Sequence, residues 1–461
     1  MSTWKRLLNR VIYNNDPDLL LSPAKKNMDR FIIQAMLGTA FGAFSGGVFL
    51  SGYLLHLGAN DFITSFIPLL PNICGIFLIF FSTLVDKRES RKKLLITINA
   101  TCKVFLISIA FVPLFVEEPF RVPIVLIFLI IGQAIAGING IAFNTWFNEL
   151  IPGQIKGRYF STRQIFCVLM SAILPVIAGY FVDHMTNKYL AFVILFLCAA
   201  LSGGIEIIVF ARIDDVKIAV NKAKTNALKA FAKPFRDKPF RTYVFISCLF
   251  HFLVHISASF SQTFLLRYLG VSFTYINAMS TINFALQMFI FYKFWGMVTD
   301  RLGSNFTLAI TMAIYTLDLL AWVFISESTL AFIYPALQVI AAIEGSGFTV
   351  GLYTRRYELM PKEGRSVYDS FFVCCLGIAL LAAPFVGKVL RDIFGSINGI
   401  DEAISFGSFR AVYLISTIAL LILNVLHLLH AKKLDLDTGS FSKDSFRKLK
   451  LIFLESIGLR R

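Results

Sequence analysis

Long apolar runs separated by short polar gaps make up most of this chain between residues 31 and 431. A helix needs about 20 apolar residues to cross the hydrocarbon core of a bilayer. Twelve runs are long enough, and we predict membrane spans at 31–57, 61–84, 94–116, 122–147, 159–183, 189–210, 242–266, 273–298, 305–326, 329–353, 366–390 and 403–431. The pattern therefore predicts an all-α integral membrane protein with 12 transmembrane helices.

The composition agrees with a lipid environment. Hydrophobic residues make up 57% of the chain and charged residues only 16%, whereas about a quarter of the residues in a soluble protein are charged. The net charge of +16 would suggest nucleic acid in a soluble protein. Here Lys and Arg gather in alternate gaps between the apolar runs, as residues that set membrane topology do. We therefore expect the lipid bilayer as a partner and no nucleic acid.

The same basic gaps orient the chain. They place both the N- and the C-terminus in the cytoplasm, and we expect the plasma (cytoplasmic) membrane. The first apolar run is too long for a cleaved signal peptide. The predicted parts are a cytoplasmic N-terminal segment at 1–30, a six-helix half at 31–210, a basic cytoplasmic linker at 211–241, a second six-helix half at 242–431 and a basic cytoplasmic tail at 432–461.

The two halves repeat one another in sequence. Three pairs of matches, spaced by 209 or 214 residues, occur in the same order: Glu149-Leu150-x-Pro152 with Glu358-Leu359-x-Pro361, Pro175 and Asp183 with Pro384 and Asp392, and Asp86 with Asp300. Six spans is an even number, so each half has the same orientation. The pattern predicts two parallel six-helix repeats about an axis along the membrane normal.

With this architecture the chain resembles the major facilitator superfamily. The sharpest motif is G-x-x-x-D-R-x-G at Gly296, Asp300, Arg301 and Gly303, and its copy in the first half keeps Asp86 but lacks both glycines. The resemblance implies two halves that rock about a site near the middle of the membrane. It also implies a cytoplasmic gate in which carboxylates face helix N-termini and Arg groups, with the residues Asp86, Arg88, Arg158, Asp300, Arg301 and Arg365.

Two features of family antiporters are absent from the sequence. Their Gly-Pro-x-x-Gly-Gly stretch in span 5 is replaced by Leu174-Pro175-Val176-Ile177-Ala178-Gly179, and Gln133 stands where an Arg is frequent in span 4. Drug/proton antiport and a coupling mechanism that uses that Arg are therefore only weakly supported.

Ionisable groups in the middle of a membrane are costly and are candidates for function. The resemblance places spans 1, 4, 7 and 10 around a central cavity, which makes Glu344 with His251 or His255 a candidate proton-coupling pair. The alternatives are a static buried ion pair and a histidine bonded to a backbone carbonyl. For Asp318 and Lys103, in spans 9 and 3, we expect structural roles, with Lys103 extending toward the cytoplasm.

Neutral polar side chains in the spans are candidates for contact with a substrate in the cavity. They are Gln34, Gln133, Asn139, Asn144, Gln262, Asn283 and Gln287. Hydrogen bonding between helices is the alternative for each of them. The seven cysteines lie inside apolar runs without a C-x-x-C pair, so we expect no metal site and no disulfide, and no cofactor.

The sequence shows no motif for a nucleophilic serine, a zinc protease or a phosphate loop. We therefore expect no enzyme activity, and a secondary active transporter that moves a small molecule by alternating access, inward or outward. Coupling to protons through Glu344, as symporter or antiporter, and a monomeric state are further expectations. The alternatives are a flippase-like carrier of lysolipids or other amphipaths and, from another class, a membrane enzyme or a sensor on a transporter scaffold.

Overall fold

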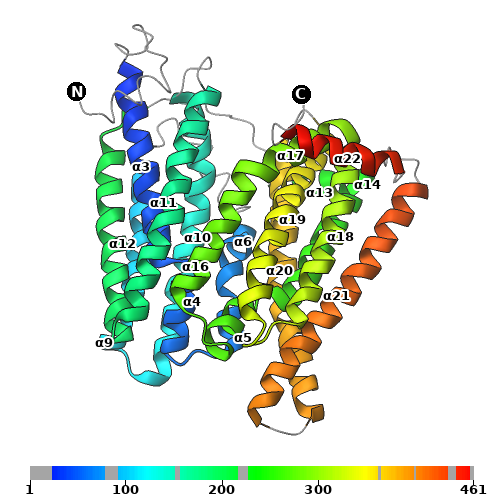
Figure 1. Ribbon diagram of the computed structural model, residues 1–461. Coiled ribbons are helices and arrows are strands. Elements are labelled where there is room, and N and C mark those ends of the chain that lie inside the picture. Colours follow the sequence, from blue (N-terminus) through cyan, green and yellow to red (C-terminus); the bar gives the residue numbers. More distant parts are fainter. Residues whose placement is uncertain are drawn as a thin grey trace. The chain divides into compact units, whose positions relative to one another are not determined.

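Every element that the computed structural model describes is helical (Figure 1). The structure describes residues 23–77, 92–150, 156–215, 227–361, 365–398, 401–433 and 443–456. Ten helices within these ranges are long and apolar enough to cross a membrane: Lys25–His56, Lys92–Phe115, Glu118–Gly137, Thr162–His184, Lys188–Ala211, Lys238–Tyr268, Ser304–Val323, Leu330–Leu359, Val367–Gly395 and Gly407–Leu428. Each coincides with a predicted span, and the prediction of an all-α membrane protein is confirmed.

The other two predicted spans are helical where the structure describes them. The span at 61–84 begins with short helices, α5 (Asp61–Ser65), η1 (Ile67–Leu69), α6 (Leu70–Ile73) and η2 (Cys74–Phe77). Pro68 and Pro71 interrupt this stretch, since proline has no N–H to give to a helix; residues 78–84 lie outside the described part. The span at 273–298 is covered by α16 (Phe273–Leu286), the π-helical turn η6 (Gln287–Phe291) and α17 (Tyr292–Leu302).

Contacts divide the chain into two compact units. Unit 1 comprises Met1–Asn60, Cys74–Ala227 and Ser272–Asn277, and unit 2 comprises Asp61–Ile73, Leu228–Val271 and Ala278–Arg461. Each unit therefore includes one short segment from the other predicted six-helix half. We call the predicted cytoplasmic end of each unit its inner end and the opposite end its outer end.

Unit 1 is a helical bundle built around α12 (Lys188–Ala211). This helix packs on α3 (Pro23–Ser45) and on α8 (Lys92–Ser108). The helix α10 (Glu118–Leu150) packs on α8, and α11 (Lys156–His184) packs on α3 (Figure 1). The shorter elements are α4 (Gly47–His56), η3 (Ile109–Phe111) and α9 (Val112–Phe115). The first span bends between α3 and α4 at Gly47, whose φ of 55° is accessible to glycine without steric cost.

Unit 2 is a second bundle, in which α18 (Ser304–Val323) packs on α19 (Leu330–Leu359) and on α21 (Asp401–Lys433). The helix α14 (Lys238–Ala258) packs on α20 (Arg365–Asn398) and on α21, and continues outward through α15 (Ser261–Thr263) and the π-helical turn η5 (Phe264–Tyr268). Two helices lie in the basic segments: α13 (Ala227–Arg236) in the linker and α22 (Lys443–Ser456) in the tail, the latter against α17 (Figure 1).

Gly347 allows α19 to approach α17 and α18 closely. A Cβ atom at this position would lie 2.5 Å from Cγ2 of Thr311 and 2.5 Å from Cε2 of Trp295. The indole cannot easily move away, because its Nε1 donates a hydrogen bond of 2.7 Å to the carbonyl oxygen of Ile343. Small residues commonly allow helices to pack closely in membranes. Here Gly347 allows close packing of α19, the helix that carries Glu344.

Replacing Gly347 by alanine should lower the stability of the protein by about 1–3 kcal/mol, because the added methyl group overfills this contact. The measurement is thermal unfolding of the detergent-purified protein, with a lower midpoint expected for Gly347→Ala. Gly204→Ala is the control, since a Cβ atom on Gly204 meets nothing within 4 Å. Equal midpoints for the two variants would contradict the tight packing of α19.

Candidate functional site

The predicted coupling residue, Glu344, lies in the middle of α19 and is only 2% exposed. It precedes the inner end of this helix by 15 residues, roughly 22 Å at the rise of an α-helix. The carboxylate of Asp318 on α18 interacts electrostatically with it, and the hydroxyl group of Tyr315 interacts with both carboxylates. Three titratable groups from two neighbouring helices therefore influence one another electrostatically in the buried part of unit 2.

Glycine at position 345 leaves room beside this group. A Cβ atom there would lie 4.0 Å from the hydroxyl oxygen of Tyr315 and 3.7 Å from Nε2 of Gln287. The predicted cavity residue Gln287 is thus close to the same turn of α19 as Glu344.

Neither carboxyl group has a cationic partner among the described residues. Oδ1 of Asp318 and Oε2 of Glu344 are buried there without a hydrogen-bond partner, and the neighbour that does contact Asp318 is the side chain of Trp322, one turn later on α18. Burying an unpaired charge costs several kcal/mol, and two neighbouring carboxylates oppose each other's ionisation. This arrangement suits two acids that do not both carry a charge, and it does not suit two fixed negative charges.

The two histidines are not bonded to Glu344. Nδ1 of His255 lies 2.8 Å from the backbone carbonyl oxygen of His251, the geometry of a hydrogen bond donated by the ring. The ring of His251 packs against Phe250 and Phe348, with centroid distances of 5.6 and 5.4 Å. Within the described ranges neither histidine forms an ion pair with Glu344. The expected pair is therefore not formed, and His255 has the alternative arrangement, a bond to a backbone carbonyl.

Two further predicted cavity residues bond to other helices or to each other. Nε2 of Gln287 donates a hydrogen bond of 2.7 Å to Oδ1 of Asn283, and Nδ2 of Asn283 donates one of 2.8 Å to the carbonyl oxygen of Gln338 on α19. Interhelical bonding, the alternative interpretation, thus applies to Asn283. Gln262 is half-buried on α15, toward the outer end.

Unit 1 contains a buried ion pair that the sequence analysis missed. Glu206 on α12 pairs with Lys103 on α8, and their residues are 3% and 5% exposed. Oε1 of Glu206 also accepts hydrogen bonds of 2.6 Å from Nε2 of Gln34 and 3.1 Å from Nδ2 of Asn99. The carboxylate is therefore surrounded by donors from α3 and α8, and it is a fixed charge.

This cluster corrects the expectation for Lys103 and shows the interhelical alternative for Gln34. Lys103 does not extend toward the cytoplasm, because the Glu206 carboxylate holds its ammonium group inside the bundle, where the ammonium also lies 3.5 Å from the carbonyl oxygen of Gly203. Gln34, predicted to contact substrate, is bonded to Glu206 and is 7% exposed. Opposite charges inside spans 3 and 6 were the signal in the sequence that pointed to this pair.

The remaining residues of the predicted first-half cavity lie on α10. Gln133 is half-buried on this helix. The side chains of Asn139 and Asn144 lie outside the described part of the chain, although both positions belong to the helix.

The predicted inner gate is described only in part. Asp86, Arg88 and the side chain of Arg158 lie outside the described residues, and Asp300 and Arg365 are exposed. Arg301 forms an ion pair of 2.7 Å with Glu455 on the tail helix α22. The motif arginine is thus engaged by the C-terminal tail.

The tail helix is itself anchored to α17. The side chain of Ile452 is 1% exposed within an apolar cluster to which α17 contributes most of the other buried residues, and the ring of Phe453 packs on that of Phe294 at 5.5 Å. Nζ of Lys293 donates a hydrogen bond of 3.0 Å to the carbonyl oxygen of Ser456. These contacts hold Glu455 next to Arg301.

At the outer end of unit 2, one carboxylate receives three donors. Oδ1 of Asp61 accepts from Nη1 of Arg267 at 3.0 Å, and Oδ2 accepts from Nη2 of Arg391 at 2.9 Å and from the hydroxyl group of Tyr268 at 2.5 Å. Asp61 is 8% exposed, and the Arg391 guanidinium lies 3.9 Å from the centroid of the Phe409 ring. Asp61 belongs to the second predicted span and both arginines to the second repeat, so this cluster links the repeated halves.

A second link between the repeats lies at the outer end of unit 1. Asp183, the predicted repeat residue at the end of α11, accepts hydrogen bonds from the backbone N–H groups of Phe273 at 3.0 Å and Thr274 at 2.8 Å, and from the Thr274 hydroxyl group at 2.5 Å. These groups form the N-terminus of α16, which attracts a carboxylate through its free N–H groups and its dipole. Asp392, the repeat partner of Asp183, instead pairs with Lys388 on its own helix.

Sequence comparison assigns part of the chain to a known family model. Residues 243–456 match the model described as Major Facilitator Superfamily. No curated protein matches the chain in sequence.

Solved transporter structures share the fold. A mutant of the nucleoside transporter NupG superposes with a TM-score of 0.69 at 14% identity, covering 87% of this chain and 99% of that one. The D-xylose-proton symporter gives a TM-score of 0.61 at 15% identity, with 87% and 97% covered. A bacterial homologue of the human lysosomal transporter Spinster gives 0.62 at 14% identity, with 91% and 99% covered. At these identities the likeness establishes the fold.

The buried pair in unit 1 yields a stability prediction. Glu206→Gln leaves the Lys103 ammonium buried without a counter-charge and should cost about 3–5 kcal/mol of stability. The matched double variant, Lys103→Met with Glu206→Leu, removes both charges and should recover most of that loss. Thermal unfolding in detergent is the measurement. A double variant no more stable than Glu206→Gln would show that the two charges do not depend on one another.

Proposed function

We propose that the chain, of which residues 243–456 match the Major Facilitator Superfamily model, is a secondary transporter of small molecules that works by proton-coupled alternating access. The observation that carries the coupling proposal is the Glu344 carboxyl group, buried in the middle of α19 next to Asp318 and without a cationic partner in the described ranges.

The chemistry of the carboxyl pair supports coupling. With one proton between them, Asp318 and Glu344 carry a single negative charge; when the proton leaves, a second charge appears in a dry site, which favours a conformation that admits water or a cation. A difference in proton affinity between two conformations is what allows a proton gradient to drive a conformational change. Other titratable groups that interact electrostatically with the pair are Tyr315, which in turn interacts with Tyr292, and Tyr413, which interacts with Asp318.

The outer links support the proposed alternation. Asp61 with its two arginines and Asp183 with the N-terminus of α16 each join the two sequence repeats at the outer end. We propose that these links break when the outer end opens. The inner-gate residues Asp86, Arg88, Arg158, Asp300, Arg301 and Arg365 would then form the contacts that close the inner end.

The proposed orientation has both termini in the cytoplasm of a plasma membrane. It rests on the basic residues of α13 and α22, which lie in the linker and the tail, since Lys and Arg are retained on the cytoplasmic side. The proposed substrate contacts are Gln133, Asn139, Asn144, Gln262 and Gln287, with a role for Gln34 and Asn283 limited by their helix-to-helix bonds.

Glu344→Gln should abolish accumulation driven by a pH gradient and spare solute exchange, because a neutral amide cannot release a proton. The measurement is uptake into proteoliposomes over a panel of solutes, with and without a pH gradient, beside counterflow with no gradient. Glu327→Gln, at an exposed position in the outer turn before α19, is the matched control and should behave like the wild type.

Counterflow also reports on folding, since a variant that exchanges solute has an intact binding site. If Glu344→Gln still accumulates solute against its gradient, the proposed coupling role is wrong. If wild-type transport is the same with and without a pH gradient while counterflow is active, proton coupling itself is wrong.

Asp61→Asn should weaken the links that hold α5 at the outer end of unit 2. Removing the carboxylate charge leaves Arg267 and Arg391 without their shared counter-charge. If this weakens the links by about 1.4 kcal/mol, the equilibrium between the linked and the unlinked arrangement shifts about tenfold. The measurement is the labelling rate of Thr64→Cys by an impermeant maleimide, which should rise several-fold in the Asp61→Asn background. The control is Asp392→Asn, since Asp392 is exposed and pairs within α20; an equal effect of the two changes would refute a specific role for Asp61.

A further inference from the structure

Unit 2 contains a cavity of about 460 Å³ between α14, α18, α19 and α21. It begins at the inner end, where Lys238 and Arg355 line it, and reaches Phe250 and Phe348. Along α14 the distance from Lys238 to Phe250 is roughly 18 Å at 1.5 Å per residue. The cavity is therefore long, and it ends one helical turn from Glu344.

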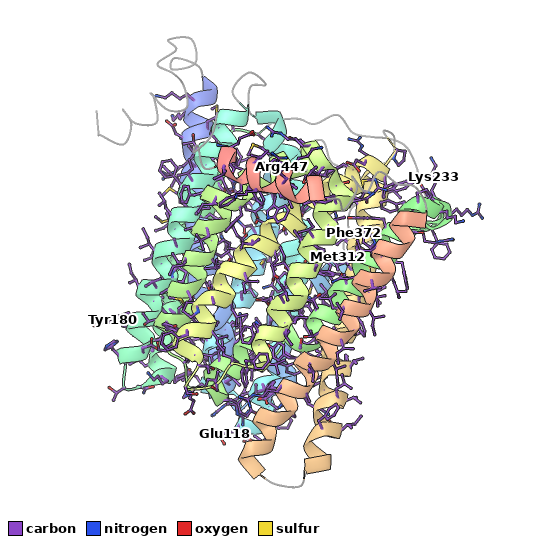
Figure 2. The ribbon with its side chains drawn as sticks, turned by 45° about the vertical axis from the view of Figure 1, so that its right-hand side comes forward. Glu118, Tyr180, Lys233, Met312, Phe372 and Arg447 are labelled. Carbon is purple, nitrogen blue, oxygen red and sulfur yellow. The ribbon has the colours of Figure 1, made fainter. Side chains whose placement is uncertain are left out.

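The cavity lining is mostly apolar, although Thr242, Ser247, Asn305 and His427 also contribute to it. The walls are formed mainly by Tyr243, Phe250, Leu308, Met312, Phe348 and Leu352, of which Met312 is marked on α18 in Figure 2. The hydroxyl group of Tyr243 is already used, because it donates a hydrogen bond of 2.8 Å to the carbonyl oxygen of Leu352. An occupant of the cavity gains more from apolar surface than from polar groups.

The mouth of the cavity is basic. Lys238 opens α14 and is exposed, and Arg355 lies in the last two turns of α19. The basic helix α13 directly precedes α14 and adds the exposed side chains of Lys233 and Arg236; Figure 2 marks Lys233 there. The exposed Arg241 follows on the first turns of α14.

Two acidic groups at the mouth are already bonded. Oε2 of Glu358 accepts from Nη1 of Arg355 at 3.1 Å and from the Ser304 hydroxyl group at 2.7 Å. Asp237 accepts from the backbone N–H of Phe240 at 3.3 Å, as the cap of α14, and from the Tyr368 hydroxyl group at 3.3 Å. Basic groups therefore outnumber acidic ones where a headgroup would lie.

An apolar channel with a basic mouth complements one kind of molecule, an amphipath with a long hydrocarbon chain and an anionic head. The membrane supplies such molecules directly as anionic phospholipids, and basic clusters at the membrane surface attract them. The side chain of Phe235 on α13 is 59% exposed among these basic groups, as in helices that lie at a lipid interface.

We propose that this cavity is a binding site for one anionic membrane phospholipid, with an acyl chain between α14, α18, α19 and α21 and the phosphate between Lys238 and Arg355. The bound lipid fills space among the helices that carry His251, Asp318 and Glu344. The site is distinct from the carboxyl pair, and it does not depend on proton coupling.

Native mass spectrometry of the purified full-length chain, titrated with phosphatidylglycerol or phosphatidylcholine, tests the proposal. One phosphatidylglycerol should be retained at activation energies that strip phosphatidylcholine. Lys238→Gln with Arg355→Gln should lower that retention at least fivefold. Met312→Trp, which fills the cavity without changing charge, should lower it to a similar extent. The control is Arg121→Gln with Lys388→Gln, which removes the same charge from the predicted outer ends and should leave retention unchanged.

Three results would overturn the proposal. Equal retention of the two lipids would remove the role of the headgroup charge. If the charge variant loses phosphatidylglycerol while Met312→Trp retains it fully, the lipid binds on the basic surface and not in the cavity. If the protein moves labelled phosphatidylglycerol from one leaflet of a proteoliposome to the other, the cavity is part of a transport pathway for amphipaths. The charge variant changes only two side chains at the mouth of the cavity, so we expect it to fold. A monodisperse profile in size-exclusion chromatography checks this.

Discussion

The absence of water in a bilayer core is the constraint on which this structure depends, because every charge placed there must be balanced by the protein itself. The two units meet it differently. In unit 1, Glu206 is balanced by Lys103 and by two amide donors. In unit 2, Asp318 and Glu344 lie together with no cation among the described residues. A balanced charge fixes a bundle, whereas an unbalanced one makes the site sensitive to protons, and this difference is the basis of the proposed mechanism.

Charge balance also explains the predicted outer ends. Asp61 draws Arg267 and Arg391 together, and Asp183 binds the free N–H groups of α16. Both contacts join segments of different repeats, although the repeats use different chemistry, a guanidinium pair in one case and a helix N-terminus in the other. At the inner end, Arg301 of the G-x-x-x-D-R-x-G motif is bonded to Glu455 of α22. The sequence repeat therefore preserves helix positions more faithfully than it preserves the partners at their ends.

The fold was largely predictable, because bilayer thickness sets the length of each apolar run and the positions of Lys and Arg set the direction. The candidate site was less so. Glu344 was identified correctly as a buried acid, but its neighbour proved to be Asp318 and not a histidine, since which faces of α14, α18 and α19 meet depends on tertiary packing. Glu206 was overlooked because its span was read only as apolar. Asp61 and Arg391 are 330 residues apart, and no local pattern connects them.

Infrared difference spectroscopy of the carboxylic C=O stretch tests the central claim most directly, because it detects a protonated carboxyl group without knowledge of the solute. The purified protein is compared in light and heavy water at neutral pH, beside Glu344→Gln and Glu206→Gln. If the pair in unit 2 shares a proton, a protonated-carboxyl band will be present in the wild type, will persist in Glu206→Gln and will be lost in Glu344→Gln. A wild-type protein without such a band, or a band that survives in Glu344→Gln, would contradict the account.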